Sequence, residues 1–316
     1  MVFSGRSNPE LAAKIAQELD VRLGRVLLKT FANGEIYARF EENVRGADAF
    51  IIQSPADSIN DELMELLIMI QAARLASARR ITAVMPYYPY SRQDKKSAAR
   101  EPITARLVAT LLEAAKVDRV LSMDLHQGQI QGFFEIPVDH MTAVPILADY
   151  FARKDFGGTP IVAVSADAGG VKLAKRFISR MPEADLAVLT KMRPEHNKAE
   201  VMHFIGDVQD KIAIIVDDMI DTAGTITSAI DTLYERGARE VYVTATHGIL
   251  SGPAYERLRA SAVKEVVVTD TLPIRLAQKD TKIRVLSVAG ILARTIKNVF
   301  EDESVSELFA GENQLF

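Results

Sequence analysis

The sequence of 316 residues contains no cysteine and no tryptophan. Without cysteine the chain can form no disulfide and has no thiolate nucleophile, so any metal ion must bind oxygen or imidazole ligands. A long apolar run is also missing, because the most apolar stretch, 63–73, contains Glu65 and Gln71 and is followed by Arg74. Since a membrane-spanning helix needs about 20 mostly apolar residues, no such helix is expected.

Neither sign of charge dominates, since 38 Lys and Arg residues oppose 42 Asp and Glu residues, for a formal net charge of -4. A mildly acidic chain has no overall attraction to nucleic acid or anionic lipid, so neither is expected as a partner. The first residues carry no secretory signal pattern, and a cytoplasmic location is expected. Hydrophobic residues at 48% and charged residues at 25% are globular values, and the length predicts about two domains.

Segments of strand length alternate with helix-like segments along nearly the whole chain. The expected strands cover residues 49–53, 81–85, 120–123, 161–165, 212–216, 240–246 and 265–269. The expected helices cover residues 61–77, 102–115, 170–178, 225–236 and 253–260, with Asn60 capping the first and Pro102 opening the second. This alternation predicts βαβ units and mostly parallel sheets, with ligand sites at the carboxyl ends of the strands. The domain junction is expected near Pro145.

One segment, 212–225, combines a strand, adjacent acids and a turn of small residues. The apolar run 212–216 leads into Asp217, Asp218, Asp221, Thr222, Ala223, Gly224 and Thr225, and a helix follows. The two adjacent carboxylates can accept hydrogen bonds from a sugar diol. The small residues let the backbone approach a ligand closely, and the N–H groups at the helix start can bind a phosphate. These features indicate a site for a phosphorylated ribose; an ordinary turn capped by aspartates is the alternative.

This segment resembles the phosphoribosyl-binding loop of type I phosphoribosyltransferases, and other motifs narrow the resemblance. Residues 86–96, 124–134, 164–171, 201–207, 246–253 and 303–306 resemble motifs of the ribose-phosphate pyrophosphokinase family, collinearly from about Phe3 to Phe309. The resemblance implies an enzyme that transfers the pyrophosphoryl group of ATP to the anomeric hydroxyl of ribose 5-phosphate, giving phosphoribosyl pyrophosphate and AMP. It also implies two similar α/β domains of the type I phosphoribosyltransferase fold, each a parallel five-stranded sheet flanked by helices.

The resemblance assigns ATP binding to two short segments. The first holds Phe31, Asn33, Gly34 and Glu35, in which Phe31 would stack on adenine and two polar side chains would contact the edge of the base. Taken alone, Asn33-Gly34 favours a plain hairpin turn. The second segment holds Arg92, Gln93 and Asp94, although a basic run such as 92–96 is usually a solvated surface.

Catalysis and metal binding are also assigned by the resemblance. Residues 189–197 would form a catalytic loop in which Lys191 and Arg193 neutralise the transferring phosphoryl group, with Arg193 also contacting ribose 5-phosphate. His126 would contact the ATP phosphates and, with Asp167, belong to a Mg²⁺ site. Since Mg²⁺ prefers oxygen ligands, the phosphate contact of His126 is expected ahead of direct ligation. A solvated loop, and a histidine that only forms structural hydrogen bonds, are the alternatives.

The resemblance further implies a domain division and a regulated oligomer. An ATP-binding domain would cover 1–145 plus about 291–316, and a ribose 5-phosphate-binding domain would cover 146–290. Family members of this length are usually hexamers that ADP inhibits and inorganic phosphate activates. Arg45, Ser304 and Ser306 would belong to the allosteric site, where Asn43 replaces a serine that many members carry.

Two other functions remain open from the sequence. A non-catalytic regulatory homologue would bind an active partner, but the chain keeps the residues assigned to catalysis and shows no insertion near 189–197. A phosphoribosyltransferase would consume phosphoribosyl pyrophosphate, but the segment 92–96 and the second domain argue against it. Release of AMP from ATP, with and without ribose 5-phosphate, separates the three.

Overall fold

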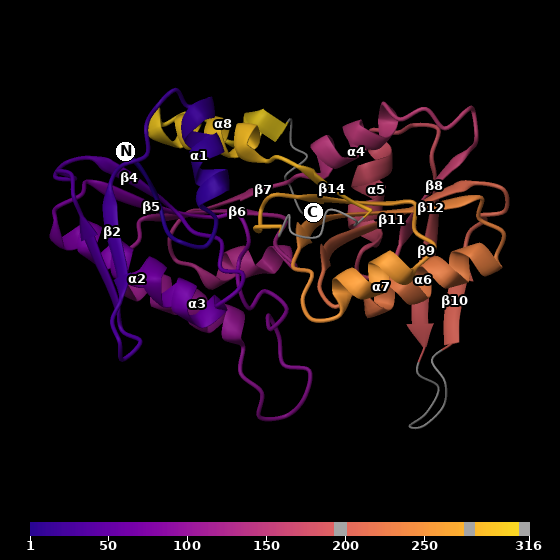
Figure 1. Ribbon diagram of the computed structural model, residues 1–316, viewed down its shortest axis with the longest axis horizontal. Helices are drawn as coiled ribbons and strands as arrows, with labels where there is room; N and C mark the ends of the chain where they lie inside the picture. The colour runs from indigo at the N-terminus through magenta and orange to yellow at the C-terminus, as the bar shows by residue number, and fades with distance from the viewer. Residues whose placement is uncertain (193–200, 275–281, 310–316) are drawn as a thin grey trace. The chain divides into compact units, whose positions relative to one another are not determined.

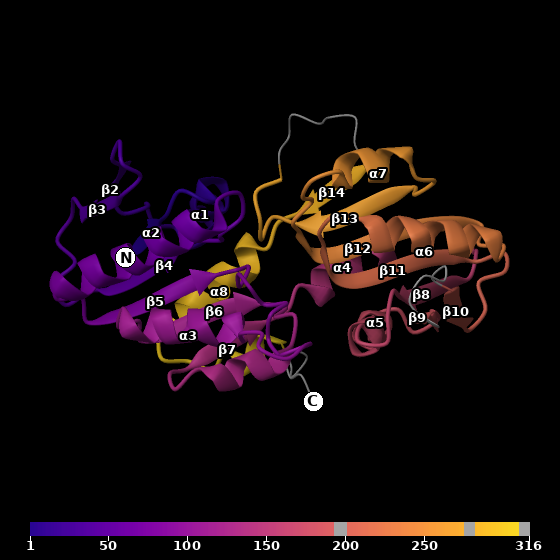
Figure 2. The same ribbon diagram turned by 90° about the horizontal axis from the view of Figure 1, so that it is seen from below.

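The chain forms two compact units, each drawn in Figures 1 and 2. The computed structural model describes residues 1–192, 201–274 and 282–309, and for residues 191, 192, 201, 202, 308 and 309 it describes the backbone alone. Unit 1 contains Met1–Thr142, Thr271–Pro273 and the chain from Ser287 onward, and unit 2 contains Ala143–Asp270 and Ile274–Leu286. Unit 1 is therefore discontinuous in sequence.

Unit 1 is built on a fully parallel five-stranded sheet. Its strands lie in the order β1-β4-β5-β6-β7, with bounds Val2–Ser4, Asp48–Ile52, Arg80–Met85, Arg119–Met123 and Val138–Met141. Helices α1 (Pro9–Glu18) and α8 (Ala289–Phe300) lie side by side on one face, and α2 (Ile59–Leu75) and α3 (Thr104–Ala114) cover the other (Figure 1). Strands β2 (Val26–Thr30) and β3 (Ile36–Phe40) form a separate hairpin, and short 3-10 helices cover Gly128–Phe133 and Ser306–Phe309.

Two helix starts in unit 1 differ from the sequence-based prediction. Helix α2 begins at Ile59, earlier than expected, with Ser58 at its N-cap. Asn60 does not cap the helix, and its side-chain oxygen accepts a hydrogen bond from the Tyr90 hydroxyl. Helix α3 begins at Thr104, so Pro102 precedes it. The first turn of α3 is held by residue 93, whose backbone oxygen accepts from the Ala105 N–H at 3.2 Å.

Unit 2 is built on a seven-stranded sheet. The strand order is β10-β9-β8-β11-β12-β13-β14, with bounds Val201–Ile205, Asp185–Met192, Ile161–Ser165, Ile212–Ile220, Glu240–Gly248, Glu265–Thr269 and Ile283–Leu286. The pairs are parallel except that β10 runs antiparallel to β9. Helices α4 (Val144–Ala152) and α5 (Val171–Ser179) cover one face, and α6 (Gly224–Glu235) and α7 (Ala254–Ala260) cover the other (Figure 1). The expected five strands are therefore correct for unit 1 and wrong for unit 2.

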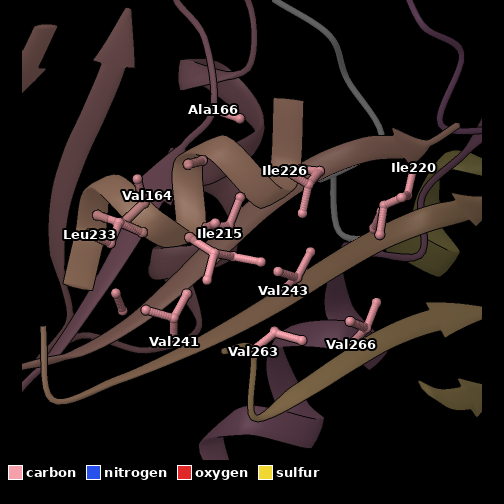
Figure 3. Close-up of a cluster of buried hydrophobic side chains, with 14 of the residues drawn as sticks. Val164, Ala166, Ile215, Ile220, Ile226, Leu233, Val241, Val243, Val263 and Val266 are labelled. Carbon is pink, nitrogen blue, oxygen red and sulfur yellow. The ribbon is translucent and has the colours of Figure 1, made fainter. Parts of the chain in front are cut away.

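The sheet of unit 2 is held by β-branched side chains packed under α6. Val164, Ile215, Val243 and Val266 come from four neighbouring strands and are almost completely buried, as Figure 3 shows for part of this cluster. Leu233 of α6 packs into the same cluster. Burying one such side chain contributes about 1.5–3 kcal/mol, so this core stabilises the packing of β8 and β11 against α6.

Candidate functional site

Strand β11 carries two acids into the carboxyl end of the sheet. The strand was expected to end at Val216, but it continues to Ile220, because β12 extends alongside it and pairs Asp217 with Ala245 and Met219 with His247. Asp217 and Asp218 therefore lie inside the strand and are both half-buried.

The carboxylate of Asp217 is held in an unfavourable electrostatic environment. Its Oδ1 accepts a hydrogen bond from the Asp218 backbone N–H at 2.9 Å. The pKa of Asp217 is nevertheless raised well above its usual value, first by loss of hydration, next by the charge of Asp218, and least by Asp167. Neighbouring negative charges of this kind are stabilised by a bound cation or by hydroxyl donors.

The turn from β11 into α6 uses a left-handed residue. Ala223 has φ +59° at the N-cap of α6, and its methyl group cannot cap the first N–H groups of the helix. The Arg257 side chain donates from Nη1 to the Thr222 backbone oxygen at 2.9 Å, and Ser251 bonds to the Asp221 carboxylate. The turn is thus fixed from the side of α7, with a helix N-terminus suited to an anion.

Glycine at position 224 leaves room for the same support. A Cβ there would lie 3.2 Å from Arg257 Nη1, which is closer than ordinary van der Waals contact. A side chain at 224 would therefore shift the guanidinium that fixes the turn by a few tenths of an ångström.

A second turn, after β8, lies beside the first because β8 and β11 are neighbours in the sheet. The Ser165 hydroxyl donates to the Asp167 backbone oxygen at 2.6 Å, and the Asp167 Oδ1 accepts from the Gly170 N–H at 2.8 Å. A Cβ on Gly170 would lie 2.8 Å from Ser165 Oγ, so the tight turn needs glycine there. Unit 2 thus brings Asp167, Asp217 and Asp218 to one edge. Among the described residues, no group of three or more His, Asp or Glu side chains is placed to hold a metal ion.

The segment 31–35 of unit 1 is the tip of the β2–β3 hairpin. The Gly34 N–H donates to the Phe31 backbone oxygen at 2.9 Å, and Asn33 Oδ1 accepts from the Glu35 N–H at 3.2 Å. The Phe31 ring remains 50% exposed, with its centroid 5.9 Å from that of Tyr37. The segment is therefore a hairpin turn, and the same turn exposes an aromatic ring on which a base could stack.

Residues 92–94 lie in the loop before α3. The Gln93 Oε1 accepts from the Thr104 hydroxyl at 2.5 Å, so this amide is oriented by the start of the helix. The Asp94 side chain is buried, whereas Arg92 and Gln93 are exposed. The structure thus separates an inward acid from two outward polar side chains.

His126 follows β6 in a constrained turn that sequence reasoning described incompletely. Asp124 has φ +37°, and its N–H donates to the Met141 backbone oxygen at 2.9 Å. The Leu125 N–H donates to Nε2 of His140, a buried residue of β7, at 2.9 Å. Sequence reasoning missed His140, because only the pairing of β6 with β7 brings it next to this turn.

The other predicted residues are placed less completely. Lys191 lies in β9 opposite Met202 of β10, but only its backbone is described, and Arg193 and most of the expected loop 189–197 lie outside the described residues. Arg45, Ser304 and Ser306 are exposed in unit 1. The Asn43 Oδ1 accepts from the Arg45 N–H at 3.0 Å, and the Ser304 backbone oxygen accepts from Asn298 at 2.8 Å.

Comparisons with known proteins agree over almost the whole chain. Residues 1–115 match the model for the N-terminal domain of ribose phosphate pyrophosphokinase, and residues 173–310 match that for a phosphoribosyl synthetase-associated domain. The ribose-phosphate pyrophosphokinase of Clostridium tetani is 52% identical over 309 residues, covering 98% of this chain and 96% of the relative. That of Fusobacterium nucleatum is 50% identical over 308 residues, covering 98% and 97%.

A solved structure gives the same result. The crystal structure of phosphoribosylpyrophosphate synthetase from Mycobacterium smegmatis matches with a TM-score of 0.91 and 48% identity, over 96% of this chain and 99% of that one. Among the described residues, no helix is long and apolar enough to cross a membrane.

Proposed function

The chain belongs to the ribose-phosphate pyrophosphokinase family, and from this premise we propose how its residues divide the work of catalysis. It is an enzyme that transfers the pyrophosphoryl group of ATP to the anomeric hydroxyl of ribose 5-phosphate, producing phosphoribosyl pyrophosphate and AMP. The anomeric oxygen attacks the β-phosphorus, and AMP leaves with the electron pair of the broken bond. Such a transfer depends on in-line placement and on positive charge around the phosphate oxygens.

Ribose 5-phosphate is proposed to bind at the carboxyl ends of β8 and β11. The 5-phosphate would sit on the N-terminus of α6, between Asp221 and Thr225, and the ribose hydroxyls would donate to Asp217 and Asp218. The observation that carries this assignment is geometric: two adjacent carboxylates at the end of β11 lead directly into the N-terminus of α6. The raised pKa of Asp217 supports it, because a sugar diol supplies the donors that two crowded carboxylates need. The residues assigned to the site are Asp217, Asp218, Asp221, Thr222, Ala223, Gly224, Thr225 and Arg193.

Mg²⁺ is the proposed cofactor, held by Asp167 and by the ATP phosphates, with His126 near those phosphates. The donor set fits a hard cation, because the turn after β8 presents a carboxylate whose Oδ1 is already oriented by the Gly170 N–H. Magnesium usually takes one or two carboxylates plus substrate phosphates, so a closed protein cage is not required. When bound, the ion neutralises charge on the transferring group.

ATP is proposed to bind the first domain, 1–145 plus about 291–316, and ribose 5-phosphate the second, 146–290. The half-exposed Phe31 ring offers a stacking surface for adenine, and Asn33, Gly34 and Glu35 lie beside it. Arg92, Gln93 and Asp94 would bind the remainder of the nucleotide. Lys191 and Arg193 are proposed to neutralise the charge that develops on the transferring phosphoryl group.

The deciding experiment measures AMP release from Mg-ATP. Release that requires ribose 5-phosphate supports diphosphate transfer, whereas release of pyrophosphate from phosphoribosyl pyrophosphate with a nucleobase would indicate a phosphoribosyltransferase. No turnover in either assay, with the protein folded, would favour a regulatory homologue.

The Lys191→Ala variant should lower kcat by about 100-fold or more and change either KM much less. A near-normal kcat would remove Lys191 from catalysis.

Regulation and assembly extend the same proposal. A hexamer, activation by inorganic phosphate and inhibition by ADP are expected from family membership, with Arg45, Ser304 and Ser306 in the allosteric site. The Asn43 amide oxygen bonds the Arg45 backbone, so position 43 is oriented toward that residue. Analytical ultracentrifugation and AMP-release assays with phosphate or ADP added test these points separately.

A further inference from the structure

A cavity of about 440 Å³ lies at the amino end of the unit 2 sheet. The first residues of β12, β13 and β14, namely Glu240, Glu265 and Ile283, all line it. Asp217 pairs with Ala245, five residues along β12 from Glu240. At ~3.3 Å per residue this separates the cavity from the Asp217 level by roughly 17 Å along the strand. The cavity therefore lies at the opposite edge of the sheet from the proposed ribose 5-phosphate site.

One acid of the cavity is fully neutralised by its neighbours. The Glu265 carboxylate accepts from the Tyr150 hydroxyl at 2.7 Å and from Lys154 Nζ at 2.6 Å. Burial alone would raise the pKa of Glu265, but these two hydrogen bonds outweigh it and lower the pKa. Lys154 also lies over the Tyr242 ring, 5.1 Å from its centroid. The pair of Lys154 and Glu265 thus adds no net charge to the cavity.

The second acid is balanced in the same manner. The Glu240 carboxylate accepts from the Tyr242 hydroxyl at 2.8 Å, which is the main cause of its lowered pKa. Lys264 Nζ lies 3.4 Å from the same carboxylate. Two lysines therefore offset two glutamates, each beside a tyrosine.

Two further cations line the cavity in excess of these pairs. Among the described residues that line the cavity, four cationic side chains oppose two carboxylates, which leaves two positive charges. Lys282 Nζ donates to the Ser261 backbone oxygen at 2.8 Å, a neutral acceptor that holds the ammonium group in place. The Arg284 side chain is 61% exposed, and its Nε forms an ion pair with the Glu265 carboxylate at 3.6 Å, a distance beyond an ordinary hydrogen bond. Lys282 directly precedes β14 and Arg284 is its second residue, and β14 lies at one edge of the sheet.

We propose that this cavity is a second anion site, which binds a phosphate dianion through Lys282 and Arg284. Two surplus positive charges match the charge of a phosphate dianion, and the planar guanidinium of Arg284 can donate two parallel hydrogen bonds to phosphate oxygens. The phosphate can be free inorganic phosphate or the terminal phosphate of a nucleotide, because both present the same group. The site is independent of the proposed catalytic function, since it shares no residue with it.

The absence of tryptophan from the sequence allows a site-specific probe. An Ile283→Trp variant carries one indole, in the lining of this cavity alone. Titration with inorganic phosphate, and separately with ADP, at ionic strength fixed by NaCl should give a saturable fluorescence change for the source that binds. In this background Lys282→Ala with Arg284→Ala should raise the dissociation constant roughly tenfold or more. Lys175→Ala with Arg259→Ala removes the same charge from exposed positions of unit 2 and should change it less than about threefold.

Equilibrium dialysis of the unlabelled chain guards against a reporter that fails to fold. The natural sequence should bind one more radiolabelled phosphate per chain than Lys282→Ala with Arg284→Ala, while ribose 5-phosphate-dependent AMP release shows that both are folded. Equal phosphate stoichiometry overturns the proposal. So does a fluorescence change that NaCl alone reproduces, or one that both double variants reduce equally.

Discussion

Asp217 combines partial burial with two neighbouring carboxylates, and this combination makes a specific prediction for ribose 5-phosphate. Asp217→Asn keeps the shape of the side chain and removes its charge. We expect the KM for ribose 5-phosphate to rise at least about tenfold, because a charged acceptor is worth about 1.5–3 kcal/mol, while the KM for ATP changes little. Steady-state kinetics with each substrate varied in turn measures both values.

The control for this prediction is Asp231→Asn, an exposed position on α6. It removes the same charge from the same unit and should leave both KM values unchanged. Equal increases in the two KM values for Asp217→Asn would contradict the assignment of the sugar to this carboxylate.

The hydrogen bond that His140 accepts leads to a second prediction for a single residue. Its Nε2 accepts from the Leu125 N–H, next to His126, and the neighbouring Asp124 has a left-handed φ. Leucine at 140 would leave a buried N–H without an acceptor, whereas the amide oxygen of glutamine can reach the Nε2 position. His140→Leu should therefore lower kcat for AMP release at least about tenfold, and His140→Gln should retain most of it.

Thermal unfolding of both His140 variants provides the comparison. If kcat falls in proportion to the loss of thermal stability in both variants, and glutamine retains no more activity than leucine, His140 is a purely structural residue.

The start of α6 illustrates how an element positions a ligand group. Ala223 is buried and left-handed, a backbone conformation that costs roughly 1–2 kcal/mol for a residue with a side chain. Ala223→Val adds β-branching in this conformation, so we expect it to destabilise the chain by at least about 2 kcal/mol and to raise the KM for ribose 5-phosphate. Urea unfolding and steady-state kinetics test the two effects.

Ala223→Gly is the matched variant, since glycine adopts the same φ without strain. It should leave the KM for ribose 5-phosphate within about threefold of the original value. A large rise in KM for glycine as well would mean that the methyl group itself, and not the backbone conformation, matters.

The same elements show what could be predicted from the sequence. Apolar runs bounded by turn residues located β8, β11, β12 and β13, because their composition is sufficient to specify buried parallel strands. The extension of β11 to Ile220 depends on pairing with β12, so Asp217 and Asp218 were expected after the strand and lie within it. Local propensity could not reveal this.

Contacts distant in sequence explain the other differences. Helix α2 begins at Ile59, and Asn60 bonds the distant Tyr90 instead of capping the helix. The sequence did not reveal His140, because its contact with Leu125 depends on the pairing of β7 with β6. In the site, the sequence pattern located the acids and the small-residue turn, but the support from Arg257 depends on α7 lying beside that turn.

At the largest scale, an ionic cluster joins three parts of unit 1 that are far apart in the sequence. Asp48 is 1% exposed and accepts hydrogen bonds from Arg79 at 2.8 Å and Arg80 at 2.9 Å, while Arg80 also bonds Asp302 at 2.6 Å. The cluster therefore ties the start of β4 and β5 to the end of α8. Asp48→Asn should reduce the free energy of unfolding by roughly 1–3 kcal/mol near neutral pH, because three charge-assisted hydrogen bonds from two arginines are weakened.

The pH dependence of this loss has a defined sign. Hydrogen bonding from Arg79 is the main cause of the lowered pKa of Asp48 in the folded chain. Its contribution is therefore complete above the unfolded-state pKa of about 3.9 and disappears as pH falls through the lower folded value. Urea unfolding at several pH values should show the original chain and Asp48→Asn converging below about pH 4. A gap that stays constant down to pH 3 would contradict this account.

The discontinuity of unit 1 makes a prediction for fragments. Leu292, Ile296 and Val299 of α8 are buried, so they cover apolar surface of unit 1. The fragment 1–142 leaves that surface open and should bind a hydrophobic dye and unfold without cooperativity. The same fragment joined by a flexible linker to residues 287–309 should unfold cooperatively. Cooperative unfolding of 1–142 alone would show that α8 is dispensable.

The late position of α8 in the sequence also sets a delay during synthesis. The 144 residues 143–286 must be translated between the first part of unit 1 and its return segment. At ~5–20 residues per second this takes roughly 7–29 s. Throughout that interval the nascent sheet of β1, β4, β5, β6 and β7 lacks α8, one of the helices that cover it. Unit 1 is thus begun first and completed last, and the growing chain offers chaperones an apolar surface for as long as unit 2 is being made.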